Sequence, residues 1–188
     1  MHGEFGYLDM ADGDLIMTEL PGVEEHELAS TYPTRLPVWW GRKGVAGVSP
    51  DEAGTTGRKV VLRFEKKFGK LEKLVFKLFG GTKEMKRSLD HLNSMLWELS
   101  DGNRTFAEIC TIMDSLFHEK VAPVQDRTAL GLNQFQKLGV LAIMKGKFDQ
   151  GWPTGPGVVP PSQTMTEKIE GIDSEPIEGE IVEWPLEP

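Results

Sequence analysis

Residues 89–109, LDHLNSMLWELSDGNRTFAEI, decide the fold class. Asp90 suits the N-cap of a first helix whose apolar side chains recur at helical spacing, and Asp101-Gly102-Asn103 ends that helix with a turn. Thr105 and Glu108 have the spacing of a capping box, in which a hydroxyl and a carboxylate each satisfy a backbone N–H of the next helix. The stretch therefore predicts two consecutive amphipathic helices joined by a tight turn.

A third helix is predicted over residues 123–138. Pro123 suits its first turn, where the missing N–H is not needed, and Gly139 suits its C-terminal cap. Gly131 inside the helix costs about 1 kcal/mol relative to alanine. Residues 140–144 then predict a short closing strand.

Three strands are predicted before the helices. Residues 58–65 alternate apolar and charged side chains with one apolar exception, residues 83–89 alternate again, and residues 38–43 are rich in aromatic side chains. The sequence thus predicts an α+β fold of winged-helix type, with a three-stranded sheet, three helices and a short closing strand.

The stretch 89–109 resembles the PqqD-like family, in which an aliphatic–Trp–Glu–Leu run, then Asp-Gly, a basic residue, Thr and Glu-Ile join the first two helices. The matching residues here are Leu96-Trp97-Glu98-Leu99, Asp101-Gly102, Arg104, Thr105 and Glu108-Ile109. Residues 135–141 also look like the closing helix and strand of that family. The resemblance covers residues 35–145, within which 44–57 look like an enlarged loop and 66–82 like a basic insertion.

The resemblance implies a non-catalytic module of the RiPP recognition element type, which presents a leader or partner peptide to a modifying enzyme. In that family the peptide adds as a strand beside the one preceding the first helix and packs against the third helix. The peptide-binding residues implied here are Lys83, Met85, Lys86, Arg87, Arg127, Leu130, Gln134 and Lys137. Because this edge is basic, the partner is predicted to be an acidic peptide or protein segment with interspersed apolar residues.

Charge divides the chain into three parts. Residues 1–57 hold 3 Lys/Arg against 10 Asp/Glu, residues 58–149 hold 17 against 11, and residues 150–188 hold 1 against 8. We therefore predict three regions, which are an acidic arm over 1–34, the domain over 35–147 and a Pro-rich acidic tail, largely extended, over 148–188. The arms either solvate the domain or lie over its basic surface and screen it.

The acidic tail itself carries the pattern expected of a partner peptide. Residues 178–184, EGEIVEW, combine acidic side chains with apolar ones. This segment is therefore a candidate internal pseudo-ligand for the groove between residues 83–89 and the third helix.

Motifs that would indicate an enzyme or a cofactor site do not occur in the sequence. There is no Gly-rich phosphate loop, nucleophile elbow or HExxH motif. The four histidines share no metal-ligand spacing with each other or with Cys110, which lies on an apolar helix face and is predicted to be a buried thiol. These absences predict a protein without a metal or cofactor. The single cysteine cannot form an intramolecular disulfide and no run of about 20 apolar residues occurs, so we predict a soluble, cytoplasmic protein.

Two features leave alternatives open. The basic segment 66–79, KKFGKLEKLVFKLF, fits a helix laid on the sheet, a weak contact with an anionic membrane surface, or a phosphate-contacting patch on nucleic acid. Trp39 and Trp40, beside Arg42 and Lys43, fit the core of a strand, a surface that stacks on bases, or an anchor for a protein interface. The runner-up functions are accordingly a nucleic-acid-binding regulator and a membrane-surface adaptor.

Overall fold

The computed structural model describes residues 20–47, 54–65, 84–161, 163, 165 and 169–185. Its strands are β1 (Tyr32–Arg35), β2 (Trp39–Lys43), β3 (Lys59–Glu65), β4 (Glu84–Ser88) and β5 (Leu141–Met144). Its helices are α2 (His91–Leu99), α3 (Phe106–Phe117) and α4 (Val124–Lys137), with 3-10 turns η1 (Val23–Glu25) and η2 (His118–Lys120). This part of the chain is therefore α+β, as predicted.

Strands β2, β3 and β4 form an antiparallel sheet in the order β2-β3-β4. Trp40 lies opposite Leu62, and Phe64 lies opposite Met85. The three strands predicted before the helices are thus confirmed, although Lys83 lies outside the described residues. The closing strand is confirmed as β5, but it pairs with β1 in a separate two-stranded sheet that the sequence did not predict.

The start of each of the first two helices is capped as predicted. Asp90 accepts a hydrogen bond from Asn93 N (2.7 Å) at the start of α2. Thr105 Oγ1 accepts one from Glu108 N (3.2 Å), and Glu108 Oε2 accepts one from Thr105 N (2.7 Å), which completes the capping box of α3. The helical hairpin predicted from residues 89–109 is confirmed.

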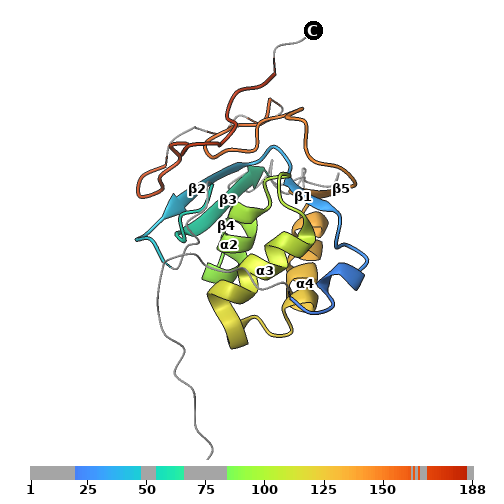
Figure 1. Ribbon diagram of the computed structural model, residues 1–188. Coiled ribbons are helices and arrows are strands. Elements are labelled where there is room, and N and C mark those ends of the chain that lie inside the picture. Colours follow the sequence, from blue (N-terminus) through green and yellow to red (C-terminus); the bar gives the residue numbers. More distant parts are fainter. Residues whose placement is uncertain are drawn as a thin grey trace, which may run out of the picture.

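Helices α2, α3 and α4 pack on one face of the β2-β3-β4 sheet (Figure 1). Trp97 of α2 is the centre of this layer, with its ring edge-to-face against Trp40 of β2 (6.2 Å between centroids) and Phe135 of α4 (5.4 Å). Gly131 allows α4 to approach α2 closely, because a Cβ there would lie 2.6 Å from Leu96 Cδ2. Pro123 is the N-cap residue of α4 and precedes the first turn in which it was predicted.

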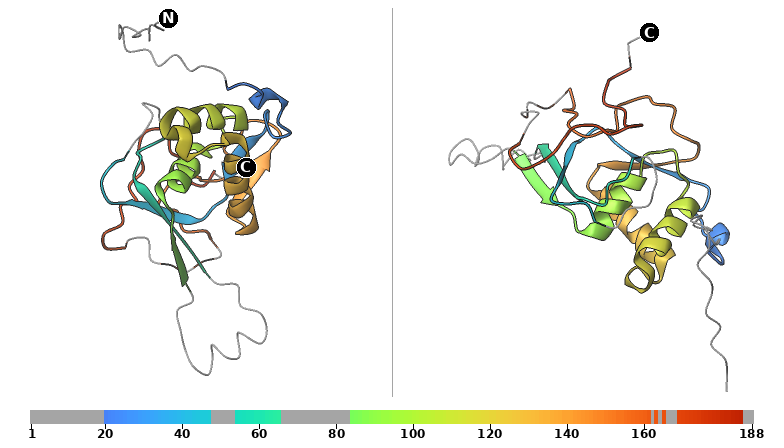
Figure 2. Two further views of the ribbon diagram at one scale, coloured as in Figure 1. Left: turned by 90° about the horizontal axis from the view of Figure 1, so that it is seen from below. Right: turned by 60° about the vertical axis from the view of Figure 1, so that its left-hand side comes forward.

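On the opposite side of the sheet the described residues of the C-terminal segment (152–161, 163, 165 and 169–184) lie over β2 (Figures 1 and 2). The segment lies so close that a Cβ on Gly41 would be 2.7 Å from Ile172 Cγ2. It hydrogen-bonds the sheet's core as well, because Trp40 Nε1 donates to Thr154 O (3.1 Å). Both faces of β2 are therefore buried, so Trp39 and Trp40 are core residues that neither stack on bases nor anchor an exposed protein interface.

Residues on both sides of 35–147 belong to the folded structure. Val23 and Ala29 are part of the hydrophobic core, and β1 begins at Tyr32. Downstream, Trp152 Nε1 donates to Arg35 O (2.8 Å). The described parts of both predicted arms thus pack against the domain.

Candidate functional site

The β2 edge of the sheet is occupied by the chain's own C-terminal segment. Arg42 N donates to Asp173 O (2.6 Å) and Asp173 N donates to Arg42 O (2.7 Å), which makes an antiparallel bridge. Gly157 N donates to Trp40 O (2.9 Å). The outward backbone groups of Trp40 and Arg42 are therefore not a free edge.

These outward bonds also fix the hydrogen-bonding alternation across the sheet. Trp40 and Arg42 point their backbone groups away from β3, so the residues opposite them, Leu62 and Val60, point theirs towards β4. The hydrogen bond from Leu89 N to Val60 O (2.8 Å) agrees with this assignment.

The same alternation identifies the outward backbone groups of β4. Arg87 lies opposite Leu62 and bonds inward to β3, so Lys86 and Ser88 direct their N–H and C=O groups away from the sheet. No hydrogen bond joins these outward groups to another part of the chain that the structure describes. Within the described residues, β4 is the open edge of the sheet.

The side chains of β4 divide between the two faces of the sheet. Met85 and Arg87 lie opposite Phe64 and Leu62, so they emerge on the face that carries the helices. Lys86 lies opposite Arg63 and emerges on the other face, as does Ser88. From Met85 to Ser88 all four residues of this edge are exposed.

Helix α4 presents the other predicted residues. Arg127, Leu130, Gln134 and Lys137 are exposed along one side of it, and Leu130 is 57% exposed although it is apolar. A Cβ on Gly131 would lie 3.4 Å from Asn93 Oδ1, so α4 crosses the first turn of α2. Only two residues, Leu89 and Asp90, separate the end of β4 from the start of that turn. We call the exposed residues of β4 and this side of α4 the β4–α4 surface.

The structure places the predicted peptide-binding residues differently from one another. Those of β4 and of α4 are all exposed, on adjacent elements, while Lys83 lies outside the described residues. On β4, Met85 and Arg87 share the helix side of the sheet, whereas Lys86 is on the opposite side. The basic segment 66–79 also lies outside the described residues.

The predicted pseudo-ligand placement is wrong. The C-terminal segment does bind the sheet, but at β2 rather than at the β4–α4 surface. Ile181 O accepts from both Thr154 N (3.0 Å) and Gly155 N (2.7 Å), which holds residues 178–184 within the C-terminal segment. The acidic side chain of Glu180 is buried against Arg42 instead of facing the basic β4 edge.

A buried ionic cluster joins β2, α2 and the C-terminal segment. Arg42 Nε donates to Glu98 Oε1 (2.7 Å), and the guanidinium also binds both carboxylate oxygens of Glu180. Thr56 N and Oγ1 donate to the Glu98 carboxylate at 2.9 and 2.7 Å. Burial alone would lower the pKa of Arg42, but the hydrogen bonds and charges of the two glutamates outweigh it, and the pKa is raised. The cluster is a structural junction with a permanently charged centre.

Sequence reasoning did not find this cluster. Its members lie 56 and 138 positions apart along the chain, so no local pattern joins them. The one available signal was Glu98, a carboxylate between Trp97 and Leu99 in an otherwise apolar turn.

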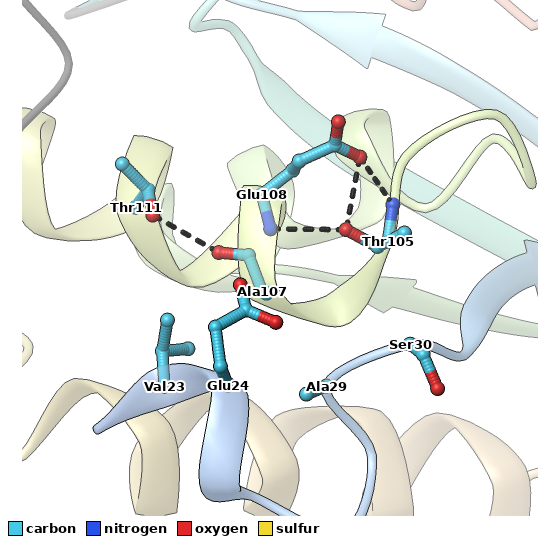
Figure 3. A pocket seen from close by; sticks show the side chains of 8 residues that line it. All are labelled: Val23, Glu24, Ala29, Ser30, Thr105, Ala107, Glu108 and Thr111. Carbon is cyan, nitrogen blue, oxygen red and sulfur yellow. Dashed lines mark hydrogen bonds between the residues drawn. The ribbon is translucent and has the colours of Figure 1, made fainter. Parts of the chain in front are cut away.

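A hollow of about 480 Å³ lies between η1 and the first turns of α3 (Figure 3). Two carboxylates line it, those of Glu24 and Glu108. Glu108 is already the helix cap, since it accepts from both the backbone N and the hydroxyl of Thr105. The hollow therefore lacks the desolvated, uncommitted acid that general acid–base chemistry requires.

Neither a metal site nor a membrane span is found in the part of the chain that the structure describes. No group of three or more His, Cys, Asp or Glu side chains there could hold a metal ion. No described helix combines the length and hydropathy that crossing a bilayer requires.

Cys110 is fully buried, as predicted, and we expect it to be unreactive in the native protein. Burial raises the pKa of its thiol to about 12, so the nucleophilic thiolate is almost absent at pH 8. An aromatic disulfide reagent at pH 8 should label it only as fast as the protein unfolds, and fully in denaturant. Rapid labelling of the native chain would contradict the burial of this helix face.

The chain matches no protein-family model, no curated protein and no solved structure.

Proposed function

We propose that the chain is a non-catalytic adaptor of PqqD-like type, which binds an extended peptide or protein segment by strand addition at β4. In this proposal the domain is of winged-helix type and the partner lies along the β4–α4 surface. The resemblance of residues 89–109 and the exposure of Met85, Lys86 and Arg87 support it.

The observation that carries the proposal is the difference between the two edges of the sheet. Proteins usually protect edge strands, because their unpaired N–H and C=O groups readily pair with another chain. Here the C-terminal segment protects β2, whereas Lys86 and Ser88 on β4 keep outward backbone groups without a partner among the described residues. An open edge beside a helix with exposed side chains is the geometry that strand-addition binding uses.

The chemistry of the surface supports binding rather than catalysis. Its polar side chains are exposed, so nothing desolvates them or holds them in a reactive orientation. The buried charged side chains Arg42 and Glu98 are instead committed to each other.

The proposal predicts that proline at position 86 weakens partner binding. Lys86→Pro removes an outward N–H, which costs no bond within the sheet because an edge strand tolerates proline where its N–H faces solvent. The partner strand would lose its hydrogen bond to the N–H of residue 86, and the proline ring would keep it from approaching closely. Binding should therefore weaken at least about tenfold. The measurement is a titration of the isotopically labelled full chain with a synthetic peptide of alternating glutamate and valine.

The matched control is Lys86→Ala, which removes the charge but keeps the N–H and should bind more tightly than the proline variant. Circular dichroism melts should confirm that both variants fold. We expect backbone amide shifts at residues 84–88 and 127–137 of the unmodified chain. No binding at millimolar peptide, or shifts confined to other parts of the chain, would overturn the proposal. Tighter binding of duplex DNA, falling steeply with salt, would favour the nucleic-acid function.

A further inference from the structure

We infer that the partner segment carries two acidic residues on alternate positions, facing away from the helices, and an apolar residue next to one of them, facing the helices. This inference rests on the strand addition proposed above and adds the side-chain pattern that β4 would select. It makes Lys86 and Met85 the residues that determine specificity. Along the added strand the order is acidic, any residue, acidic, apolar, or the reverse.

The face away from the helices is basic along Ser88 and Lys86. Lys86 lies directly opposite Arg63, and on the same face Lys43 lies directly opposite Lys59. Like charges in opposed positions repel each other. Lys43 Nζ donates to Ser88 Oγ (3.1 Å), which brings a further positive charge to the β4 edge.

The carboxylate of Glu84, two residues before Lys86 on the same face, is already committed to another cation. Glu84 Oε2 accepts from Arg63 Nε (2.7 Å). Among the described residues, Lys43, Lys59 and Lys86 form no ion pair. A neighbouring strand would place its side chains about 5 Å from those of β4. Carboxylates opposite Lys86 and Ser88 would therefore meet uncompensated positive charge.

The helix side of the same edge is apolar at Met85. Its side chain is 39% exposed, opposite the partly buried Phe64. Leu130 on α4 is also exposed. Met85 is on β4 and Leu130 is on α4, so each of the two elements that flank the proposed peptide offers one exposed apolar side chain. An apolar side chain opposite Met85 would cover them from water.

At the β2 edge the chain's own C-terminal segment also combines an acidic and an apolar residue, but its apolar residue, Ile172, lies on the face of the sheet away from the helices. Asp173 pairs with Arg58 (2.6 Å) while its backbone bridges Arg42. The residue before it, Ile172, packs its side chain against Gly41. An acidic residue beside an apolar one thus already recognises one edge of this sheet. The β4 edge offers a basic and an apolar side chain to a second segment.

Two peptides of identical composition test the pattern. The first contains Thr-Glu-Thr-Glu-Val-Thr, which puts both glutamates on one side of a strand and valine on the other. The second contains Glu-Thr-Glu-Thr-Val-Thr, which puts all three on the same side. With identical flanking residues and the full chain, the first should bind about five- to tenfold tighter by fluorescence anisotropy.

Charge reversal tests the role of Lys86. Lys86→Glu should weaken the first peptide, and a version with lysine in place of both glutamates should recover binding to this variant. Lys145→Glu, an exposed lysine outside the β4–α4 surface, is the matched control and should leave binding unchanged.

The outcomes separate this inference from the proposal beneath it. Equal affinities for the two peptides, with amide shifts at residues 84–88, would overturn the pattern and leave strand addition intact. Shifts absent from residues 84–88 would overturn both. Preference for anionic vesicles or duplex DNA over either peptide would overturn both in favour of a polyanion surface.

Discussion

Replacing Trp97 by alanine should lower the free energy of unfolding by about 3–5 kcal/mol. The side chain is fully buried, and it fills the junction of the sheet, α2 and α4 between the rings of Trp40 and Phe135. Alanine would leave a cavity that these large rings cannot collapse to fill, because the interior is close-packed. Urea denaturation of the full chain, followed by circular dichroism, measures the effect.

The matched control is Trp184→Ala. Trp184 is 42% exposed in the C-terminal segment, so its loss should cost less than about 1 kcal/mol. A third variant, Trp97→Phe, should cost less than alanine, since Trp97 Nε1 is buried without a hydrogen-bond partner among the described residues. If Trp97→Ala costs less than about 1 kcal/mol, then α2 does not present this face to the core.

The helical part of the fold could be predicted because its signals are local. Asp90, Thr105 and Glu108 bind backbone groups only three residues away, so the sequence contains the complete cap. The Asp-Gly dipeptide is also a local signal for the turn, and the structure adds a tertiary reason for the glycine. Gly102 has a φ of 80°, a conformation that favours glycine, and Phe148 and Thr34 leave no room for a Cβ.

Gly131 shows how a local penalty can reflect a tertiary requirement. Propensity alone made it a weakness of α4. The structure gives it a role, because any side chain there would collide with Leu96 of α2. The third helix therefore packs close to the first, which brings its exposed side near β4.

The position of the C-terminal segment on the sheet could not be predicted, because its sequence has no helical or strand periodicity. It is held by separate contacts, such as Gly157 N to Trp40 O and the bridge between Asp173 and Arg42, and not by a helical or strand repeat. Composition correctly indicated an acidic, Pro-rich segment, but composition does not encode which cation each acid meets. Asp173 and Glu180 bind Arg58 and Arg42, not the lysines of β4.

The residues of the candidate site came from the resemblance to the PqqD-like family, and those that the structure describes are exposed on β4 and α4. Which edge of the sheet is open depends on long-range pairing, and only the structure shows that the tail lies at β2.

The second large effect is expected at the buried ionic cluster. Arg42→Met should lower the free energy of unfolding by about 3–5 kcal/mol, because it leaves the Glu98 and Glu180 carboxylates buried without their cation. The side chains of Arg42, Glu98 and Glu180 are only 1%, 0% and 2% exposed. Urea denaturation of the full chain at pH 7 measures the effect.

Arg58→Met is the matched control, because it removes an ion pair between the same C-terminal segment and the sheet. Arg58 and Asp173 are 25% and 42% exposed, and solvent screens such a pair, so its loss should cost at most about 1 kcal/mol. A larger loss for Arg42→Met than for Arg58→Met would show that burial of an ion pair, and not the number of ion pairs, determines its contribution to the free energy of unfolding. Equal losses for the two variants would mean that the C-terminal segment is held as a unit. A negligible loss for Arg42→Met would mean that Glu180 leaves the cluster readily, and that the covered β2 edge opens in solution.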